Sequence, residues 1–347
     1  MAVRLGLIGC GKIGQRHLQA LTHLPEAVLV ATADTDLARA EAAAVPFDAR
    51  AFGSPEALLA AGGVDAVIVA TPSGYHPDLA QLAMEQGLDV LVEKPLALSL
   101  ARARELVEFA AKAGLVLATT HFNRMLPAVA QVLEAVRAGA LGRLLSGGVA
   151  VRWARPQAYY DEAPWRGQRA LDGGILFNQA IHALDLAVQV FGPAEEAFCY
   201  AATQTHQIEA EDLVAGSVRF RSGALVTVSA TTSVPETNLE ERLTIIGTGG
   251  VAVLGPEIHR LAVWRARGDP EDQEFVAAAT KAAEEPWPRW KSHLNALRDF
   301  VTAVTTRRPP ELAAASALDA LALVEALTRS GQTGRPVSVA ELEAAAS

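Results

Sequence analysis

The hexapeptide GCGKIG, residues 9–14, limits the possible folds of this chain more than any other segment. It matches the pattern G-x-G-x-x-G, follows an apolar run typical of a buried strand (3–9) and opens a segment with helical apolar spacing (12–24). Glycines permit a tight turn and a close backbone approach to a pyrophosphate, while the helix start offers free N–H groups. We therefore predict a dinucleotide-binding loop rather than a turn needed only for packing. Its contacts are assigned to Gly9, Gly11, Lys12, Ile13 and Gly14.

An acidic residue at the end of the second predicted strand indicates which dinucleotide is bound. In dinucleotide-binding domains a carboxylate is expected about 20 positions after the glycine motif, and Asp34 occupies that place. A carboxylate can accept hydrogen bonds from both ribose hydroxyls and repels a 2′-phosphate. No arginine adjoins Asp34 in the sequence. We therefore predict NAD as the cofactor, with NADP disfavoured.

The first third of the chain alternates between strand-like and helical segments. Further strands are predicted at 27–34, 64–72, 89–95 and 115–120, and helices at 35–44, 54–60, 77–87 and 99–114. Ser54 is a predicted N-cap, followed by Pro55 at the first helical position. Such alternation predicts an α/β fold with a doubly wound parallel sheet, the Rossmann type, over residues 1–122.

After residue 122 several strand-like runs follow one another, which predicts a second domain of α+β type over 123–347. These runs are 144–153, 197–206, 213–223, 224–234, 241–255 and 259–266. A hairpin is predicted around Ser222 and Gly223, within a large and mostly antiparallel open sheet. The charged, proline-rich stretch 267–290 is predicted to be a long loop. Two late helices, 294–304 and 316–332, could pack back on the first domain.

Composition excludes several classes of function. The 347 residues carry a formal net charge of −9, which argues against a binder of nucleic acid or of anionic membranes. No apolar run approaches the roughly 20 residues of a membrane helix. The two cysteines, Cys10 and Cys199, form no disulfide framework or CxxC metal motif, so a reducing cytoplasm is expected. His121, His206 and His259 lack companions at zinc-like spacing, and no metal is predicted.

Two polar residues interrupt the apolar helical segment 171–192. Asn178 and His182 are four residues apart and therefore share one side of a helix. They could be hydrogen-bonded core residues, or they could line a site. The motif EKP, residues 93–95, ends another predicted strand, and ligands of doubly wound sheets bind beyond such strand ends. By itself EKP is equally typical of a surface ion pair before a proline turn.

Taken together, the motifs resemble those of the Gfo/Idh/MocA family of sugar and cyclitol oxidoreductases. The shared stretches cover nearly the whole chain. They are GCGKIG, ATPSGYH (70–76), EKP, NRMLP (123–127), GGILFNQAIHALD (173–185), EDLVAGSVRFRSGAL (211–225) and SGQTGRPV (330–337). The string at 159–182 is most similar to members that act on nucleotide-linked N-acetyl amino sugar uronates.

The resemblance implies roles for individual residues. Lys94 would lie near the nicotinamide and the reacting hydroxyl, and His182 would be the acid/base group, with Lys94 approaching from the first domain and His182 from the second. Asn178 stands where the family usually has aspartate, and an amide cannot take up a proton. The implied cofactor contacts are Thr71, Pro72, His76, Glu93, Lys94, Asn123, Trp165 and Arg166. The implied substrate contacts are Lys94, Tyr160, Arg166, Asn178, His182 and His293.

The expected activity is NAD-dependent hydride transfer to or from a sugar hydroxyl. Because Tyr159, Tyr160, Trp165, Arg166 and Arg169 crowd the segment before Asn178, we expect an anionic or nucleotide-linked sugar. The alternatives are an inositol or free-sugar dehydrogenase, a glycoside hydrolase that borrows NAD transiently, and a non-catalytic NAD-binding regulator. Apolar strands of the second domain predict a homodimer or homotetramer formed through its sheet.

Overall fold

The computed structural model describes residues 2–266 and 288–345, which form two compact units. Met1–Phe122 and Pro288–Leu318 make up the first unit, and Asn123–Trp287 and Asp319–Ser347 make up the second. The predicted long loop lies almost wholly outside the described residues. Within the described ranges, no helix is long and apolar enough to cross a membrane.

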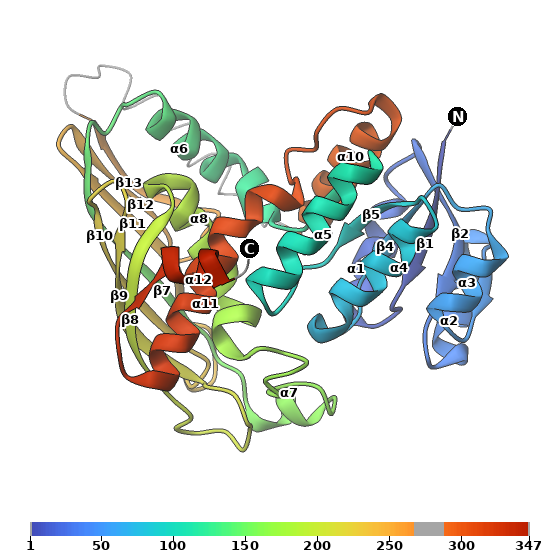
Figure 1. The fold of residues 1–347 in the computed structure, drawn as a ribbon, viewed down its shortest axis with the longest axis horizontal. Coiled ribbons are helices and arrows are strands. Elements are labelled where there is room, and N and C mark those ends of the chain that lie inside the picture. Colours follow the sequence, from blue (N-terminus) through green and yellow to red (C-terminus); the bar gives the residue numbers. More distant parts are fainter. Residues whose placement is uncertain (1, 267–287, 346–347) are drawn as a thin grey trace. The chain divides into compact units, whose positions relative to one another are not determined.

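The first unit is built on a parallel sheet of six strands in the order β3-β2-β1-β4-β5-β6 (Figure 1). The strands are β1 (Val3–Ile8), β2 (Ala27–Ala33), β3 (Arg50–Phe52), β4 (Ala66–Val69), β5 (Asp89–Val92) and β6 (Leu117–Thr119). This is the strand order of dinucleotide-binding domains, so the predicted Rossmann fold is confirmed. The three-residue strand β3 is the one that no apolar run marks in the sequence.

Six helices complete the first unit. They are α1 (Lys12–Leu21), α2 (Leu37–Ala44), α3 (Pro55–Ala61), α4 (His76–Glu85), α5 (Leu100–Ala113) and α10 (Arg289–Thr306). The predicted cap of α3 is confirmed, because the Ser54 hydroxyl accepts a hydrogen bond from the Ala57 N–H and Pro55 opens the helix. Helix α5 ends at Gly114, whose left-handed backbone suits glycine.

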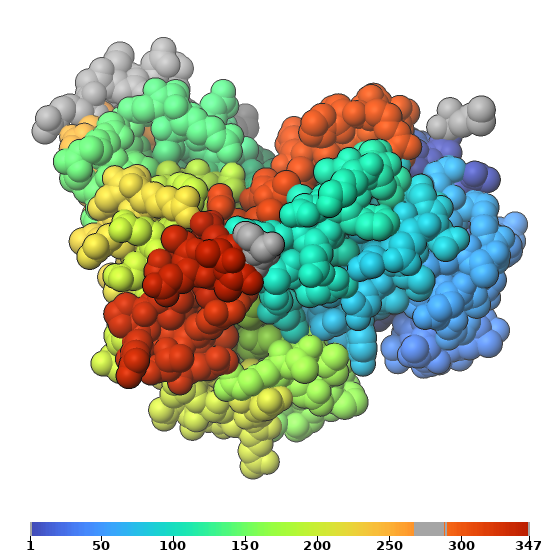
Figure 2. Space-filling view, in the orientation of Figure 1, coloured from blue at the N-terminus to red at the C-terminus, as the bar shows by residue number. Residues whose placement is uncertain are grey.

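The late helix α10 belongs to the core of the first unit. It packs on α1, and its Leu297 and Phe300 are fully buried in the same apolar cluster as Leu5, Ile68 and Leu91 of the sheet. Figure 2 shows this late segment (orange) against N-terminal residues (blue and cyan). A helix almost 290 residues from the chain start therefore covers apolar surface that the first 122 residues leave open.

The second unit contains an eight-stranded sheet in the order β13-β12-β11-β7-β10-β9-β8-β14. The strands are β7 (Leu144–Arg152), β8 (Ala194–Ala202), β9 (Leu213–Phe220), β10 (Leu225–Thr231), β11 (Glu240–Gly247), β12 (Gly250–Leu254), β13 (Leu261–Ala266) and β14 (Val337–Ser338). All neighbours pair antiparallel except β7 and β10. The predicted sheet type is confirmed, as is the hairpin at Ser222 and Gly223, which joins β9 to β10.

Helices cover one face of this sheet (Figure 1). The α-helices among the described residues of the unit are α6 (Pro127–Arg137), α7 (Gln157–Asp161), α8 (Ile181–Phe191), α11 (Leu318–Thr333) and α12 (Val339–Ala345). Helix α8 packs on β7 and β11, and α12 packs on β8. The opposite face carries apolar side chains that remain exposed, including Tyr200 (73%), Leu225 (58%) and Ile246 (40%).

Candidate active site

The glycine loop fits the pyrophosphate of a dinucleotide. Gly9 has a φ of +95°, and a Cβ there would lie 2.6 Å from the Ala70 carbonyl oxygen. A Cβ on Gly14 would lie 2.3 Å from the Gly9 carbonyl oxygen, so both positions require glycine. A Cβ on Gly11 would meet nothing within 4 Å, and Gly11 caps the start of α1 without a side-chain hydrogen bond. Gly9 and Gly14 therefore serve packing. Gly11 leaves open space in front of the α1 N–H groups, and Lys12 and Ile13 lie in the first turn of that helix.

Asp34 follows β2, as predicted, and its carboxylate already organises the loop. Its Oδ2 accepts the Cys10 N–H at 2.9 Å and its Oδ1 accepts the Asp36 N–H at 2.9 Å. The structure corrects one premise of the cofactor prediction, because Arg39 of α2 places its Nη1 3.6 Å from Asp34 Oδ1. This arginine is five residues away along the chain, and the fold of the β2–α2 turn brings it back beside the carboxylate.

The ends of β4 and β5 are tied together by His76. Its Nδ1 lies 2.7 Å from the Pro95 carbonyl oxygen and its Nε2 lies 2.9 Å from the Thr71 carbonyl oxygen. Burial lowers the pKa of His76, which is 1% exposed. The imidazole thus fixes the positions of Thr71–Pro72 and Lys94–Pro95. Any cofactor contact in this region would come from those loops more readily than from the His76 ring.

Glu93 is a buried anchor beneath Lys94. Its Oε1 accepts a hydrogen bond from His17 Nε2 at 2.8 Å, and its Oε2 accepts from Thr120 Oγ1 at 2.7 Å and from the Lys94 N–H at 3.3 Å. Burial alone would raise the pKa of Glu93, but the hydrogen bond and charge of His17, with those of its other partners, hold it far below the usual value. An ionised Glu93 therefore faces protein groups, while it holds the Lys94 backbone in place.

His293 joins this buried group rather than standing alone. It lies on α10, is 1% exposed, and places its Nε2 3.6 Å from Glu93 Oε1. Ligand-type atoms of His17, Glu93 and His293 lie within 4.8 Å of one another, the only such group of three that the described residues contain. His17 Nε2 already donates a hydrogen bond to Glu93. A ring nitrogen that donates a hydrogen bond does not bind a metal ion, so this contact fits a hydrogen-bonded cluster rather than a metal site. The absence of a metal stays a prediction.

The segment with Asn178 and His182 is not one continuous α-helix. Residues Leu176–Ala180 form a π-helical turn, and α8 begins at Ile181. Such single turns are rare and are frequent at functional sites. His182 is 7% exposed on the first turn of α8, and Asn178 lies in the π turn. The two predicted residues therefore sit on a local irregularity that their spacing does not reveal.

Asp172 is a site residue that the sequence reasoning missed. The Asn178 amide donates a short hydrogen bond to Asp172 Oδ1, and Asp172 Oδ2 accepts the Gly167 N–H at 2.8 Å. Asp172 is 2% exposed. A carboxylate is thus present beside position 178, although the usual aspartate is replaced there. The only sequence signal was an acidic residue directly before the glycine pair at 173 and 174.

A buried ion pair between Arg124 and Asp185 fixes the position of α8. Arg124 donates from Nε to Asp185 Oδ2 at 2.7 Å and makes a second, short hydrogen bond to Oδ1, with both side chains almost fully buried. Its neighbour Asn123, predicted to contact the cofactor, donates its amide to Glu241 Oε1 at 3.2 Å. The segment NRMLP therefore orients α8 within the second unit.

Five side chains before the π turn form a continuous stack, in the order Trp153, Arg155, Tyr159, Arg166 and Trp165. The Arg155 guanidinium lies 4.8 Å from the Trp153 ring centroid and 5.3 Å from that of Tyr159. The Arg166 guanidinium lies 4.1 Å from Tyr159 and 4.9 Å from Trp165. We call this set the arginine–aromatic stack. Each guanidinium group lies over two aromatic rings, and its N–H groups are the part that can bind an anion.

Other predicted substrate residues have different surroundings. Tyr160 is buried outside the stack, where its hydroxyl and Thr232 Oγ1 are 2.9 Å apart, and burial raises the pKa of Tyr160 to about 12. Arg169 Nη1 lies 3.4 Å from Glu211 Oε2, so this arginine already faces a carboxylate. Arg169 is 43% exposed, whereas Arg166 is 11% exposed and has a buried Nε without a hydrogen-bond partner among the described residues, which makes Arg166 the stronger candidate for an anion partner.

Three features define an oxidoreductase with an NAD-binding domain. They are the glycine loop on a Rossmann sheet, the acidic residue after β2 and the lysine after β5. Models of known families agree with this class. Residues 3–121 match the oxidoreductase family with an NAD-binding Rossmann fold, and residues 129–253 match the GFO/IDH/MocA C-terminal domain. The chain belongs to the Gfo/Idh/MocA family, which confirms the resemblance inferred from its motifs.

Relatives within the family act on different sugars. The WlbA dehydrogenase of Bordetella pertussis, solved with NADH and UDP-GlcNAcA, is 33% identical over 97% of each chain and superimposes with a TM-score of 0.89. The D-apiose dehydrogenase of Paraburkholderia graminis is 29% identical over 98% of this chain and 90% of its own. The UDP-N-acetylglucosamine 3-dehydrogenase of Acidithiobacillus ferrooxidans is 30% identical over 67% of this chain and 68% of its own. The chain is accordingly an NAD-binding oxidoreductase of the sugar and cyclitol dehydrogenase type.

Proposed function

We propose that this oxidoreductase transfers a hydride between NAD and a hydroxyl group of an anionic sugar derivative, with a uronate of a nucleotide-linked sugar as the favoured substrate. The arginine–aromatic stack carries this proposal. Arg166 is nine-tenths buried, and its Nε has no hydrogen-bond partner among the described residues. Its nearest carboxylate, Glu162, lies 3.5 Å away. A buried guanidinium edge that is only partly satisfied suits a carboxylate or phosphate of the substrate. The likeness to WlbA, solved with UDP-GlcNAcA, supports the same substrate class.

In the proposed reaction, Lys94 and His182 assist the transfer of the proton. NAD, which the glycine loop 9–14 and Asp34 would hold, would supply the hydride acceptor for the carbinol carbon. His182 accepts the hydroxyl proton as general base and returns it in the reverse direction. Lys94, whose backbone is fixed by Glu93 and Thr120, holds the same hydroxyl oxygen through its ammonium group. Asn178 orients a neighbouring hydroxyl, and the Asp172 carboxylate fixes the rotamer of its amide.

Matched substrates test the proposed substrate class. We expect kcat/KM for UDP-GlcNAcA to exceed that for UDP-GlcNAc at least about tenfold, because a hydrogen bond to a charged group is worth roughly 1.5–3 kcal/mol. Steady-state rates of NADH formation measure this ratio. Arg166→Gln should remove most of the preference, whereas Arg260→Gln, which alters an exposed arginine, should retain it. Equal or higher kcat/KM for neutral free sugars would favour the free-sugar dehydrogenase alternative.

We also propose that the open face of the eight-stranded sheet forms an interface between two copies of the chain. Leu225 and Ile246 lie on this face on either side of Ser146, to which each is paired across a strand. Contiguous exposed apolar residues of this kind mark interfaces. NAD binding and catalysis do not require this contact, so the proposal stands apart from the substrate class.

Light scattering at micromolar concentration should give the mass of a dimer or tetramer. The double variant Leu225→Glu with Ile246→Glu should shift the mass to that of a monomer, since it buries two carboxylates at an apolar contact. Leu37→Glu, at an exposed position of α2, is the matched control and should leave the mass unchanged. A monomeric mass for the unaltered protein would refute the proposed interface.

A further inference from the structure

Asp212 is a fully buried carboxylate outside the residues assigned to catalysis. It precedes β9, is 0% exposed, and accepts backbone N–H groups from three successive residues. These are Gln204 at 2.8 Å, Thr205 at 3.0 Å and His206 at 3.1 Å. Burial alone would raise the pKa of Asp212, but the hydrogen bonds from Thr205, Gln204 and His206 outweigh burial and keep it below the usual value. An ionised Asp212 therefore shapes the loop between β8 and β9.

His206, in that loop, makes hydrogen bonds through both ring nitrogens. Nδ1 lies 2.8 Å from Asp212 Oδ2, and Nε2 lies 2.6 Å from the Arg155 carbonyl oxygen. The His206 ring therefore links the Asp212 carboxylate to the backbone of Arg155. Both side chains are nearly inaccessible, at 6% and 0% exposure.

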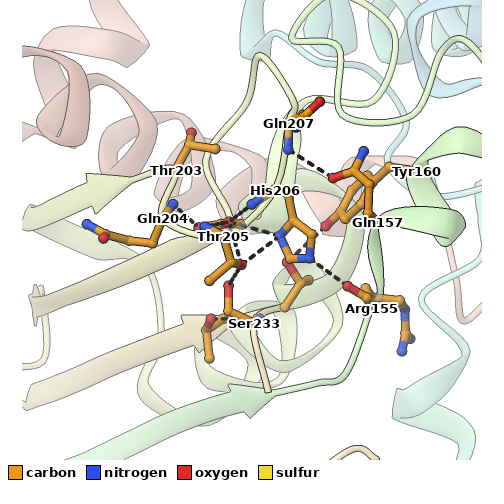
Figure 3. Close-up of polar contacts among 12 residues, drawn as sticks. Arg155, Gln157, Tyr160, Thr203, Gln204, Thr205, His206, Gln207 and Ser233 are labelled. Carbon is orange, nitrogen blue, oxygen red and sulfur yellow. Dashed lines mark hydrogen bonds and ion pairs between the residues drawn. The ribbon is translucent and has the colours of Figure 1, made fainter. Parts of the chain in front are cut away.

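The hydrogen-bonded pair of Asp212 and His206 contacts the segment that carries the arginine–aromatic stack. Arg155 is itself a member of the stack, and its carbonyl is the group held by His206. The His206 ring also packs on Tyr160, with centroids 4.8 Å apart, and the Gln207 N–H donates to Gln157 Oε1 at 2.9 Å (Figure 3). Three contacts from one loop thus bind both ends of a segment only six residues long. The orientation of Arg155 and Tyr159 depends on them.

We propose that the hydrogen-bonded pair Asp212–His206 is a positioning device that holds the arginine–aromatic stack in the geometry that receives the anionic part of the substrate. The proposal rests on the proposed function for the role of the stack, but the positioning itself does not. The Asp212 carboxylate fixes the turn at 204–206, the turn positions the His206 ring, and the ring holds the backbone at Arg155. Neither residue touches the reacting groups in this scheme.

Hydrogen–deuterium exchange measures the positioning without any substrate. In His206→Ala, exchange of amides 153–166 should accelerate at least about tenfold, the change that corresponds to losing a hydrogen bond to a charged group. His206→Gln keeps one donor for the Arg155 carbonyl and should give a smaller increase, which serves as the readout if the alanine variant does not fold. His259→Ala removes a histidine elsewhere in the second unit and should leave this segment unchanged.

Kinetics of the same variants separate positioning from general loosening. For UDP-GlcNAcA, KM should rise about tenfold in His206→Ala while kcat stays within about threefold, because the lost interaction serves binding and not the chemical step. Unchanged exchange at 153–166, or acceleration spread evenly over the second unit, would overturn the positioning role. Faster exchange confined to 153–166, together with equal use of UDP-GlcNAcA and UDP-GlcNAc by the unaltered protein, would support the positioning role and reject the proposed substrate.

Discussion

Replacing His182 or Lys94 by alanine should lower turnover at least about 10²-fold, the scale of lost acid/base assistance. His182→Ala removes the proposed base and leaves the hydroxyl proton to water. Lys94→Ala removes the ammonium group and keeps the backbone N–H that Glu93 and Thr120 accept. Steady-state NADH formation at saturating substrate measures both losses. NAD binding, followed by quenching of tryptophan fluorescence, should survive in His182→Ala, because that residue belongs to the second unit.

Two control variants show whether the losses are specific. Lys112→Ala alters an exposed lysine of α5, and His259→Ala alters a histidine between β12 and β13. Both should retain nearly full turnover. The proposed roles fail for whichever of Lys94 and His182 can be replaced with only a few-fold loss, and that residue would then be structural. A loss in His182→Ala that is matched by a loss of NAD binding would point to misfolding rather than to chemistry.

The cofactor preference should respond strongly to Asp34. The unaltered protein should bind NAD at least tenfold more tightly than NADP, an estimate that follows from repulsion between the Asp34 carboxylate and a 2′-phosphate. Asp34→Ser should shrink or invert this ratio, since it removes the repulsive charge and releases Arg39, whose Nη1 lies 3.6 Å from Asp34 Oδ1. An arginine at that place suits a phosphate. Fluorescence titrations with both dinucleotides measure the ratio.

Arg39 provides the internal control for this change. The double variant Asp34→Ser with Arg39→Ala should lose the added NADP affinity while it keeps the weakened NAD binding, because no cation then remains for the 2′-phosphate. Arg39→Ala alone should leave the NAD preference in place. Equal or tighter binding of NADP by the unaltered protein would contradict the assignment of Asp34 to the ribose.

Much of the first unit could be predicted because its signals are local. The glycine loop, the helix that follows it and the aspartate after β2 lie within 34 consecutive residues, and their spacing reflects one strand–turn–helix–strand unit. The cap of α3 and the hairpin at Gly223 are also local patterns. Strand β3 has only three residues and is partly exposed, so no apolar run marked it.

The surroundings of the candidate catalytic residues were harder to predict. Helical spacing indicated that Asn178 and His182 lie on one side of a helix, but the π turn depends on how residues 172–181 fit against their neighbours. Asp172 could not be recognised as the partner of Asn178, because a pattern shows the period of a helix and not the partner of an amide. In the sequence, His206 has no companion at zinc-like spacing and is therefore not predicted to bind a metal. In the structure its partner is the buried carboxylate of Asp212.

The sequence by itself determined the class of the chain: a Rossmann domain with a glycine loop and Asp34, a second domain with a mostly antiparallel sheet, and the motif residues Lys94 and His182. These follow from periodicity and from residues close together in the chain. Only the tertiary structure decided that His17 supports Glu93, that Arg155 is held by His206 and that Trp153, Tyr159 and Trp165 sandwich two arginines. The two hydrogen bonds join residues 76 and 51 positions apart, and they depend on strand order and loop path, which no local pattern encodes. The ring contacts join residues within 153–166, and they depend on the path of that loop.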